Sequence, residues 1–224
     1  MPQNKSKKIL LYFFLFLIIG TLNNKNLNNP NLSKISKINV EGLSEVKNTE
    51  VINSLNFLKI NNLFFLDKIK VQKTLNSNNL IQKYTVYKKY PSTLNIKIEK
   101  TKFLAQIKND KGSFFLGSNG RLIKTNDLRE DIPFIFGNFK IENFLLFKKE
   151  IDDSELDFNS IKNLFFFKSG RWDIKTKSGL IIKLPKKNIK KSLNLVVNFI
   201  NQKSEIEMSV IDIRQNNQII VNGK

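Results

Sequence analysis

The sequence contains no histidine and no cysteine among its 224 residues. The chain therefore has no imidazole base, no thiol nucleophile and almost none of the ligands that zinc and iron–sulfur sites need. Disulfides are excluded too, so any folded part must be stabilised by packing alone. Only carboxylates, Lys, Tyr, Ser and Thr remain for chemistry. We expect no catalytic residues, no cofactor and no metal.

Phosphate-binding loops are also missing, because neither G-x-x-x-x-G-K-[ST] nor G-x-G-x-x-G occurs in the chain. The acidic residues between positions 150 and 157 lack the spacing and the loop glycine of an EF-hand. We interpret them as the solvated start of a helix. The sequence therefore predicts neither nucleotide binding nor a small-molecule substrate.

Negative charge is scarce, with 19 Asp and Glu against 38 Lys and Arg. Such a surplus raises nucleic acid or an anionic membrane surface as partners. Only four of the basic residues are arginine, whereas surfaces that clamp phosphates or read bases favour arginine. A coding bias towards Lys, Asn, Ile and Phe accounts for the surplus better, so we expect no nucleic acid partner.

The amino terminus carries the one uncharged apolar run of note, Ile9 to Leu22, preceded by lysines at positions 5, 7 and 8. A positive flank before an apolar run predicts a cytoplasmic amino terminus and export of the remainder. The run is short for a membrane span of about 20 residues, and a cleaved signal peptide is the competing interpretation. No A-x-A site follows it. We predict a tail at 1–8, a transmembrane anchor at 9–22 and a linker at 23–34.

Residues 35–100 show the pattern of a small α+β domain. A strand before Gly42 is followed by two helical segments, the first capped by Asn48 or Thr49 and the second, ending near Leu75, capped by Asp67. Two alternating stretches, 81–89 and 94–99, then predict a hairpin. The expected order is β-α-α-β-β.

Residues 101–224 read as a second, β-rich domain with flanking helices. Alternation predicts strands at 103–108 and 113–116, a hairpin at 171–185, and strands at 210–214 and 218–221. Helical spacing predicts helices at 154–166 and 189–200. If the last strand lies at a sheet edge, its unpaired backbone groups are available to a strand from another chain.

Several motifs in this order resemble those of the FtsQ/DivIB cell-division family, whose first domain is a POTRA domain. In the first domain they are I-x-V-x-G-L at 38–43, N-L-F-F-L-D at 62–67, and V-Y-K-K-Y-P-S-T-L-N-I-K-I-E at 86–99. In the second they are I-P-F-I-F-G at 132–137, R-W-D-I-K at 171–175 and V-I-D-I-R at 210–214. The family's proline shortly after Glu99 is absent, and Gln215 replaces the aromatic residue that often follows Arg214.

The resemblance implies a non-enzymatic division scaffold, α+β in fold class, with one amino-terminal transmembrane helix, a POTRA-like domain and a mixed-sheet β domain. It implies a single-pass type II protein of the inner membrane at the division septum, with its bulk in the periplasm. The implied partners are FtsB-like and FtsL-like coiled-coil bitopic proteins. The implied partner-binding residues are Arg171, Arg214, Gln215, Asn216, Asn217, Gln218, Ile219, Ile220 and Val221.

Two other functions compete with this interpretation. A POTRA-like unit also serves as a peptide dock in protein export or outer-membrane assembly, although such proteins usually carry tandem units and no repeat is visible here. The other competing interpretation is a basic envelope protein that binds anionic polymers, or a hydrolase that uses carboxylates.

Overall fold

The structure is a computed structural model that describes residues 3–22, 34–127, 129–203, 208–215 and 218–223. The chain divides into two compact units, residues 1–100 and 101–224. Each buries its own hydrophobic cluster. The elements place the chain in the α+β class, as the sequence predicted.

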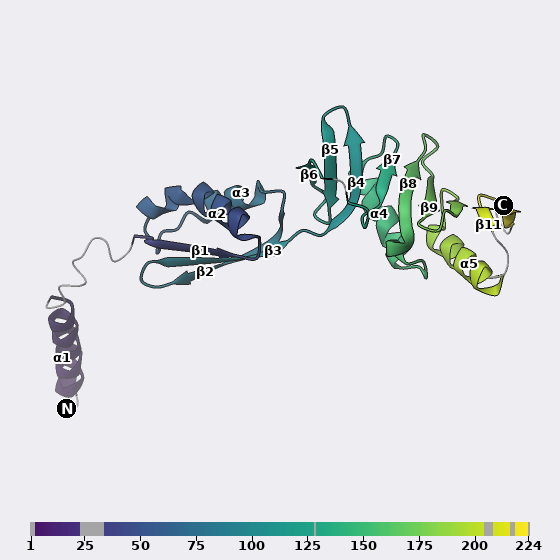
Figure 1. The fold of residues 1–224 in the computed structure, drawn as a ribbon. Coiled ribbons are helices and arrows are strands. Elements are labelled where there is room, and N and C mark those ends of the chain that lie inside the picture. The colour runs from purple at the N-terminus through teal and green to yellow at the C-terminus, as the bar shows by residue number, and fades with distance from the viewer. Residues whose placement is uncertain (1–2, 23–33, 128, 204–207, 216–217, 224) are drawn as a thin grey trace. The chain divides into compact units, whose positions relative to one another are not determined.

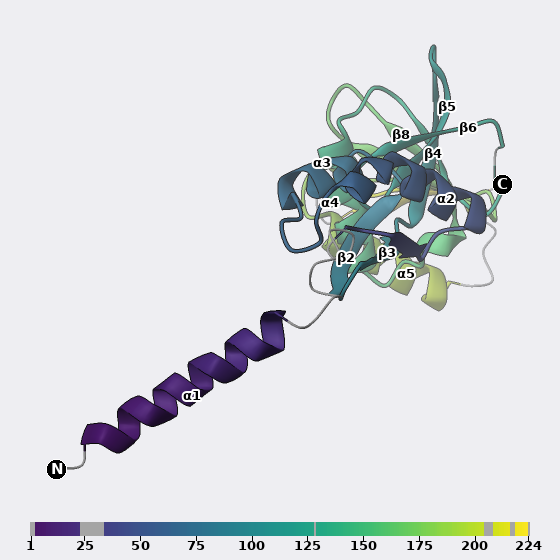
Figure 2. The same cartoon turned by 90° about the vertical axis from the view of Figure 1, so that its left-hand side faces the viewer.

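The amino-terminal helix α1, Gln3–Leu22, is one continuous helix (Figure 2). Every side chain from Ile9 to Ile19 is at least 46% exposed, so apolar surface surrounds this stretch of the helix. Across the described parts of the chain, none of the helices reaches the combination of length and apolar character that crossing a membrane requires.

The first folded unit has the predicted β-α-α-β-β order, with a short 3-10 helix added. Its elements are β1 Lys37–Glu41, α2 Glu45–Ser54, η1 Asn56–Ile60, α3 Lys68–Asn76, β2 Ile81–Lys89 and β3 Thr93–Lys100. The three strands form one sheet in the order β1-β3-β2, in which β1 runs parallel to β3 and β2 antiparallel to it. Both helices lie over one face of this sheet (Figure 1).

Two local predictions about this unit have opposite outcomes. The Asp67 cap is confirmed, because its carboxylate accepts a hydrogen bond from the Lys70 amide at 3.0 Å. The predicted cap at Asn48 or Thr49 is wrong, since α2 already begins at Glu45 after Ser44. Asn48 instead binds both backbone groups of Leu43, at 3.1 and 3.3 Å, and holds the preceding turn.

Gly42 fits this turn because it has no side chain. Its φ is +112°, and a Cβ there would lie 1.8 Å from the carbonyl oxygen of Ile98. No L side chain satisfies both conditions, so this glycine of the I-x-V-x-G-L motif lets the chain leave β1 close against β3.

The second unit is a nine-stranded mixed sheet with two helices. Its elements are β4 Phe103–Asn109, β5 Gly112–Gly117, β6 Leu122–Thr125, β7 Phe134–Phe136, α4 Ile141–Asp152, η2 Phe158–Ser160, β8 Ile161–Phe166, β9 Trp172–Thr176, β10 Ile181–Lys183, α5 Ile189–Gln202, β11 Met208–Asp212 and β12 Ile220–Gly223. The strand order is β12-β11-β10-β9-β8-β7-β4-β5-β6.

The two helices cover one face of this sheet. Phe144 and Phe147 on α4, and Val196 on α5, belong to the same buried cluster as Trp172 on β9. The rings of Phe147 and Trp172 stack with centroids 4.8 Å apart. A row of paired residues runs beneath the helices from β7 to β12, namely Ile135, Leu164, Ile174, Ile182, Ile211 and Val221. This row ties the last strand to the core.

The helix predicted over 154–166 is wrong. Residues 161–166 form β8, and the helix of this region lies earlier, at 141–152. Ile161 and Leu164 are both buried although they are three positions apart, because the register shifts between Ile161 and Asn163. An extra residue of this kind makes a strand imitate helical spacing. Glu150 and Asp152 accordingly lie in the last turn of α4 and not at a helix start.

A candidate partner-binding edge at the end of the large sheet

Strand β12 is the terminal strand of the large sheet. It pairs antiparallel with β11, and β11 pairs parallel with β10. The sequence placed the last strand at 218–221, and the observed strand begins two residues later, at Ile220. Its other side has no neighbour among the described strands. The predicted carboxy-terminal strand is therefore confirmed with a shifted boundary, and among the described strands it lies at the sheet edge.

The register shows which backbone groups of β12 face outward. The amide of Ile213 donates to the carbonyl of Lys183 at 3.1 Å, so Ile211 and Ile213 direct their backbone groups towards β10. Asp212, one residue out of phase, must then face β12, where it pairs with Ile220. Ile220 therefore bonds inward, and the N–H and C=O of Val221 point away from the sheet.

The side chains of β12 alternate between the two faces of the sheet. Val221 is half-buried and paired with Ile211 on the helix-covered face, while Ile220 is 48% exposed on the other face. Ile220 ends a second row of paired residues across that other face: Phe136, Phe165, Asp173, Lys183, Asp212 and Ile220. Charged residues thus line the open face beside the edge strand.

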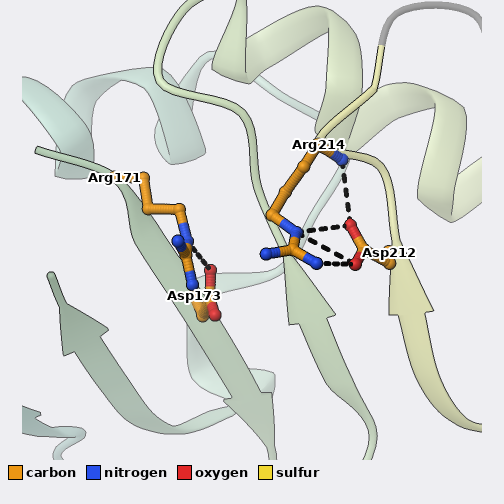
Figure 3. A network of polar contacts seen from close by, with 4 residues as sticks. All are labelled: Arg171, Asp173, Asp212 and Arg214. Carbon is orange, nitrogen blue, oxygen red and sulfur yellow. Dashed lines mark hydrogen bonds and ion pairs between the residues drawn. The ribbon is translucent and has the colours of Figure 1, made fainter. Parts of the chain in front are cut away.

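Arg214 and Asp212 form the ion pair nearest to the edge (Figure 3). The guanidinium of Arg214 donates from Nε to both carboxylate oxygens at 2.9 Å, and its backbone amide donates to Oδ1 at 3.1 Å. Hydrogen bonding by Arg214 lowers the pKa of Asp212, despite partial desolvation of the carboxylate. The carboxylate holds the arginine in one place while leaving its side chain 43% exposed.

Arg171, the residue before β9, forms a second ion pair with Asp173 on β9 (Figure 3). The Nε of Arg171 lies 3.4 Å from Oδ1 of Asp173, and Asp173 is only 4% exposed. The guanidinium also lies over the ring of Phe167, 4.2 Å from its centroid. The side chain of Arg171 is 26% exposed, against 43% for Arg214, and its charge already faces an internal carboxylate.

The remaining predicted site residues fall into two groups. Gln215 and Gln218 are exposed and Ile219 is half-buried against the core cluster of the second unit. Asn216 and Asn217 lie outside the described residues. The structure thus brings Arg214, Ile219, Ile220 and Val221 together at one end of the sheet. Arg171 lies on the same open face as Arg214, beside β9, which is two strands from β11.

Sequence reasoning missed the two aspartates that hold these arginines. Each arginine lies two residues from its carboxylate, as Arg171-x-Asp173 and Asp212-x-Arg214. Residues two apart on a strand share a face. That spacing, within segments already predicted to be strands, was the signal that could have found both pairs.

The acidic residues near α4 serve structural roles. Asp152 pairs with Lys148, and Glu150 accepts a hydrogen bond from the Lys190 amide at the first turn of α5, at 3.1 Å. Asp157 caps η2 by accepting from the Asn159 amide. Within the described residues, no group of three acidic side chains is arranged to hold a metal ion.

Comparison with known families assigns both units. Residues 33–100 match the family "POTRA domain, FtsQ-type", and residues 105–214 match "Cell division protein FtsQ/DivIB, C-terminal". The chain belongs to the FtsQ/DivIB family. The resemblance stated from the motifs is confirmed. The second match ends at Arg214, so strand β12 lies beyond the matched residues.

Individual FtsQ/DivIB relatives are distant. The cell division protein DivIB of Bacillus subtilis is 30% identical over 132 residues, which are 58% of this chain and 48% of that protein. The chain thus aligns with about half the length of this relative. The cell division protein FtsQ of Rickettsia bellii is 23% identical over 196 residues, 84% of this chain and 72% of that protein.

Among solved structures, the major extracytoplasmic domain of DivIB from Geobacillus stearothermophilus is similar to this chain at 14% sequence identity. The match covers 48% of this chain and 97% of that structure, with a TM-score of 0.35. A similarity of this size supports no residue-level comparison.

Proposed function

We propose that this chain is a cell-division scaffold that receives a strand from a bitopic coiled-coil division protein of the FtsB or FtsL kind along β12. The observation that carries the proposal is the outward-facing backbone of Val221 at an edge strand tied to the core through Ile211. An added strand takes its affinity from backbone hydrogen bonds and its specificity from alternate side chains.

The charges beside the edge supply the specificity. Arg214 is held by Asp212 in a fixed position with much of its side chain exposed. A strand added along β12 with an acidic residue near Arg214 would find that arginine already ordered, so little side-chain entropy is lost on binding. Exposed Ile220 offers an apolar contact on the same face.

The proposal includes attachment to the inner membrane, with residues 1–8 in the cytoplasm and the two folded units outside it. Its support is the uncharged run at 9–22, the preceding lysines, and the exposed apolar surface around α1. Mass spectrometry of the membrane-extracted protein should find an intact amino terminus. A mature chain that starts near Asn23 would contradict the anchor but leave the binding edge untouched.

Proline scanning along β12 tests the edge. Val221→Pro removes an outward donor, and we expect it to abolish binding of the organism's own FtsB-like protein in a pull-down from membranes. Val221→Thr keeps the donor and the strand propensity, so it should bind as the parent does. Ile220→Pro removes an inward ladder donor instead and should loosen β12 from β11.

Folding controls separate the outcomes. Fluorescence of Trp172, the one tryptophan of the chain, reports whether the second unit remains folded. Arg214→Gln should weaken binding roughly ten- to a hundred-fold, as loss of a charge-assisted contact does. Unchanged binding in folded Val221→Pro and Arg214→Gln would move the partner surface away from this edge.

A further inference from the structure

The first folded unit exposes large apolar side chains at the end where its chain begins. Ile60 is 80% exposed, Phe64 59%, Phe65 85% and Tyr90 56%. The rings of Phe64 and Tyr90 lie 4.9 Å apart, so two separate segments of the chain contribute to one surface. We call residues 59–65 and 88–91, with Lys34, the amino-terminal tip.

Backbone contacts join these segments. Lys34 forms an isolated antiparallel bridge with Asn62, the amide of Ile35 donates to the carbonyl of Asn61, and Ser36 donates to Ser92. Figure 1 shows that β1 begins at the same end of the sheet at which β2 turns into β3. The tip therefore contains Lys34, the first described residue after α1.

Charge is unevenly distributed between the two ends of this unit. Lys34, Lys59 and Lys89 are exposed at the amino-terminal tip, and Lys88 donates to the carbonyl of Phe64 at 3.2 Å. Residues 34–100 contain five carboxylates, of which only Asp67 lies near the tip; Glu41 and Glu99 lie at the opposite strand ends, and Glu45 and Glu50 on α2. The tip thus combines exposed aromatic side chains with several lysines.

Chain length limits how far the tip can be from α1. Eleven residues, 23–33, separate α1 from Lys34. Such a segment spans at most about 40 Å when fully extended. A bilayer that holds α1 is therefore always within reach of the tip. The tip also has the composition of segments that lie in membrane interfaces, since its aromatic and aliphatic side chains are flanked by lysines.

We propose that the amino-terminal tip inserts Phe64, Phe65 and Ile60 into the headgroup region of an anionic bilayer. The lysines around it meet the negative lipid headgroups, and the apolar side chains enter the boundary with the acyl chains, about 5–10 Å deep. The inference rests on the proposed membrane attachment. It adds a second contact that fixes the orientation of the first folded unit against the membrane surface.

The absence of cysteine allows a single-site test on the full chain. Phe65→Cys, labelled with an environment-sensitive fluorophore, is reconstituted into vesicles that contain anionic lipid. Its emission should shift to the blue and lose intensity when spin-labelled lipids are added. Val46→Cys is the matched control, because Val46 is also apolar, is 70% exposed and lies in the first turn of α2 at the opposite end. Its emission should not change.

The lysines are tested by charge reversal in the Phe65→Cys background. Lys59→Glu with Lys89→Glu should abolish the blue shift on anionic vesicles, while Lys73→Glu with Lys97→Glu changes the net charge equally and should preserve it. Vesicles of neutral lipid alone should give a smaller shift. An adjoining protein as the true occupant would instead give a shift that depends on that protein and not on lipid charge.

Flotation of the same samples keeps the two proposals apart. If the chain floats with the vesicles while the label at position 65 stays in water, the tip inference is overturned and the anchor stands. If the unlabelled chain does not float, both are overturned. Partner binding at β12 is measured separately and is affected by neither result.

Discussion

The amino-terminal tip and the β12 edge are both exposed, but they expose different parts of the chain. At the tip the backbone is paired, through Lys34 with Asn62, and the side chains of Phe64 and Phe65 face solvent. At the edge the backbone of Val221 faces outward and its side chain is half-buried. A surface of side chains suits a fluid partner such as lipid, and a surface of backbone groups suits a strand.

The difference predicts which substitutions matter at each place. Side-chain changes should decide the behaviour of the tip, and backbone changes that of the edge. The largest expected effect is on the stability of the second unit, from a substitution beneath the edge. The buried side chains there hold β12 in position.

Ile211→Ala should destabilise the second unit by about 2–5 kcal/mol, the range for truncating a fully buried isoleucine. Ile211 is 0% exposed and pairs with Val221. Denaturant unfolding followed by Trp172 fluorescence measures the change in the second unit alone. Ile220→Ala, on the exposed face of the same edge, should change the unfolding free energy by less than about 0.5 kcal/mol. Equal losses would show that β12 is not organised into a buried and an open face.

Asp67→Ala should cost the first unit about 1 kcal/mol, since it removes the cap of α3 immediately after the tip. Its carboxylate accepts from the Lys70 amide. Amide hydrogen exchange at Lys70 should quicken, because a helix end without its cap opens more readily. Asp67→Asn retains a capping side chain and serves as the control. If exchange at Lys70 is unchanged in the alanine variant, the Asp67 carboxylate does not stabilise the first turn of α3.

The smallest expected effect is on pH dependence at the edge. Hydrogen bonding by Arg214 lowers the pKa of Asp212 in the folded state below the unfolded value of about 3.9. The unfolded chain then binds more protons in this range, so the pair stabilises the fold fully above about pH 4 and ceases to do so as the pH falls through the lowered pKa.

Asp212→Asn should therefore flatten the acid side of the stability profile, measured by Trp172 fluorescence between neutral and acid pH. Arg214→Gln breaks the same pair from the other side and should remove the same slope. A slope that survives both changes would assign the acid sensitivity to carboxylates elsewhere in the unit.

Sequence patterns located most helices and strands but not the local irregularities within them. The strand before Gly42, the Asp67 cap and the hairpin of β9 and β10 were found where they were predicted. The segment 154–166 was mistaken for a helix because a bulge in β8 imitates helical spacing. Apolar periodicity cannot distinguish these two causes, since both place Ile161 and Leu164 on one buried face.

The candidate site was less accessible to sequence reasoning than the fold. Arg214 and the last strand could be named from their resemblance to the family, but the direction of each backbone group could not. That direction depends on whether Asp212 or Ile211 faces β12, which one hydrogen bond between Ile213 and Lys183 decides. The surface of the tip could not be predicted either. Phe64 and Tyr90 are 26 positions apart in the sequence, and their rings meet only because the turn between β2 and β3 lies beside the segment that carries Phe64.

The sequence by itself determined the chemistry that is excluded, the family, the α+β class and the order of most elements, because these depend on composition and on local repeats of two or three to four residues. Only the tertiary structure decided which arginine is enclosed, which face of β12 is open and which aromatic residues share a surface. These properties arise from strand register and from contacts between distant segments. A shift of one residue in register reverses every side chain and backbone group on a strand, and local sequence does not record it.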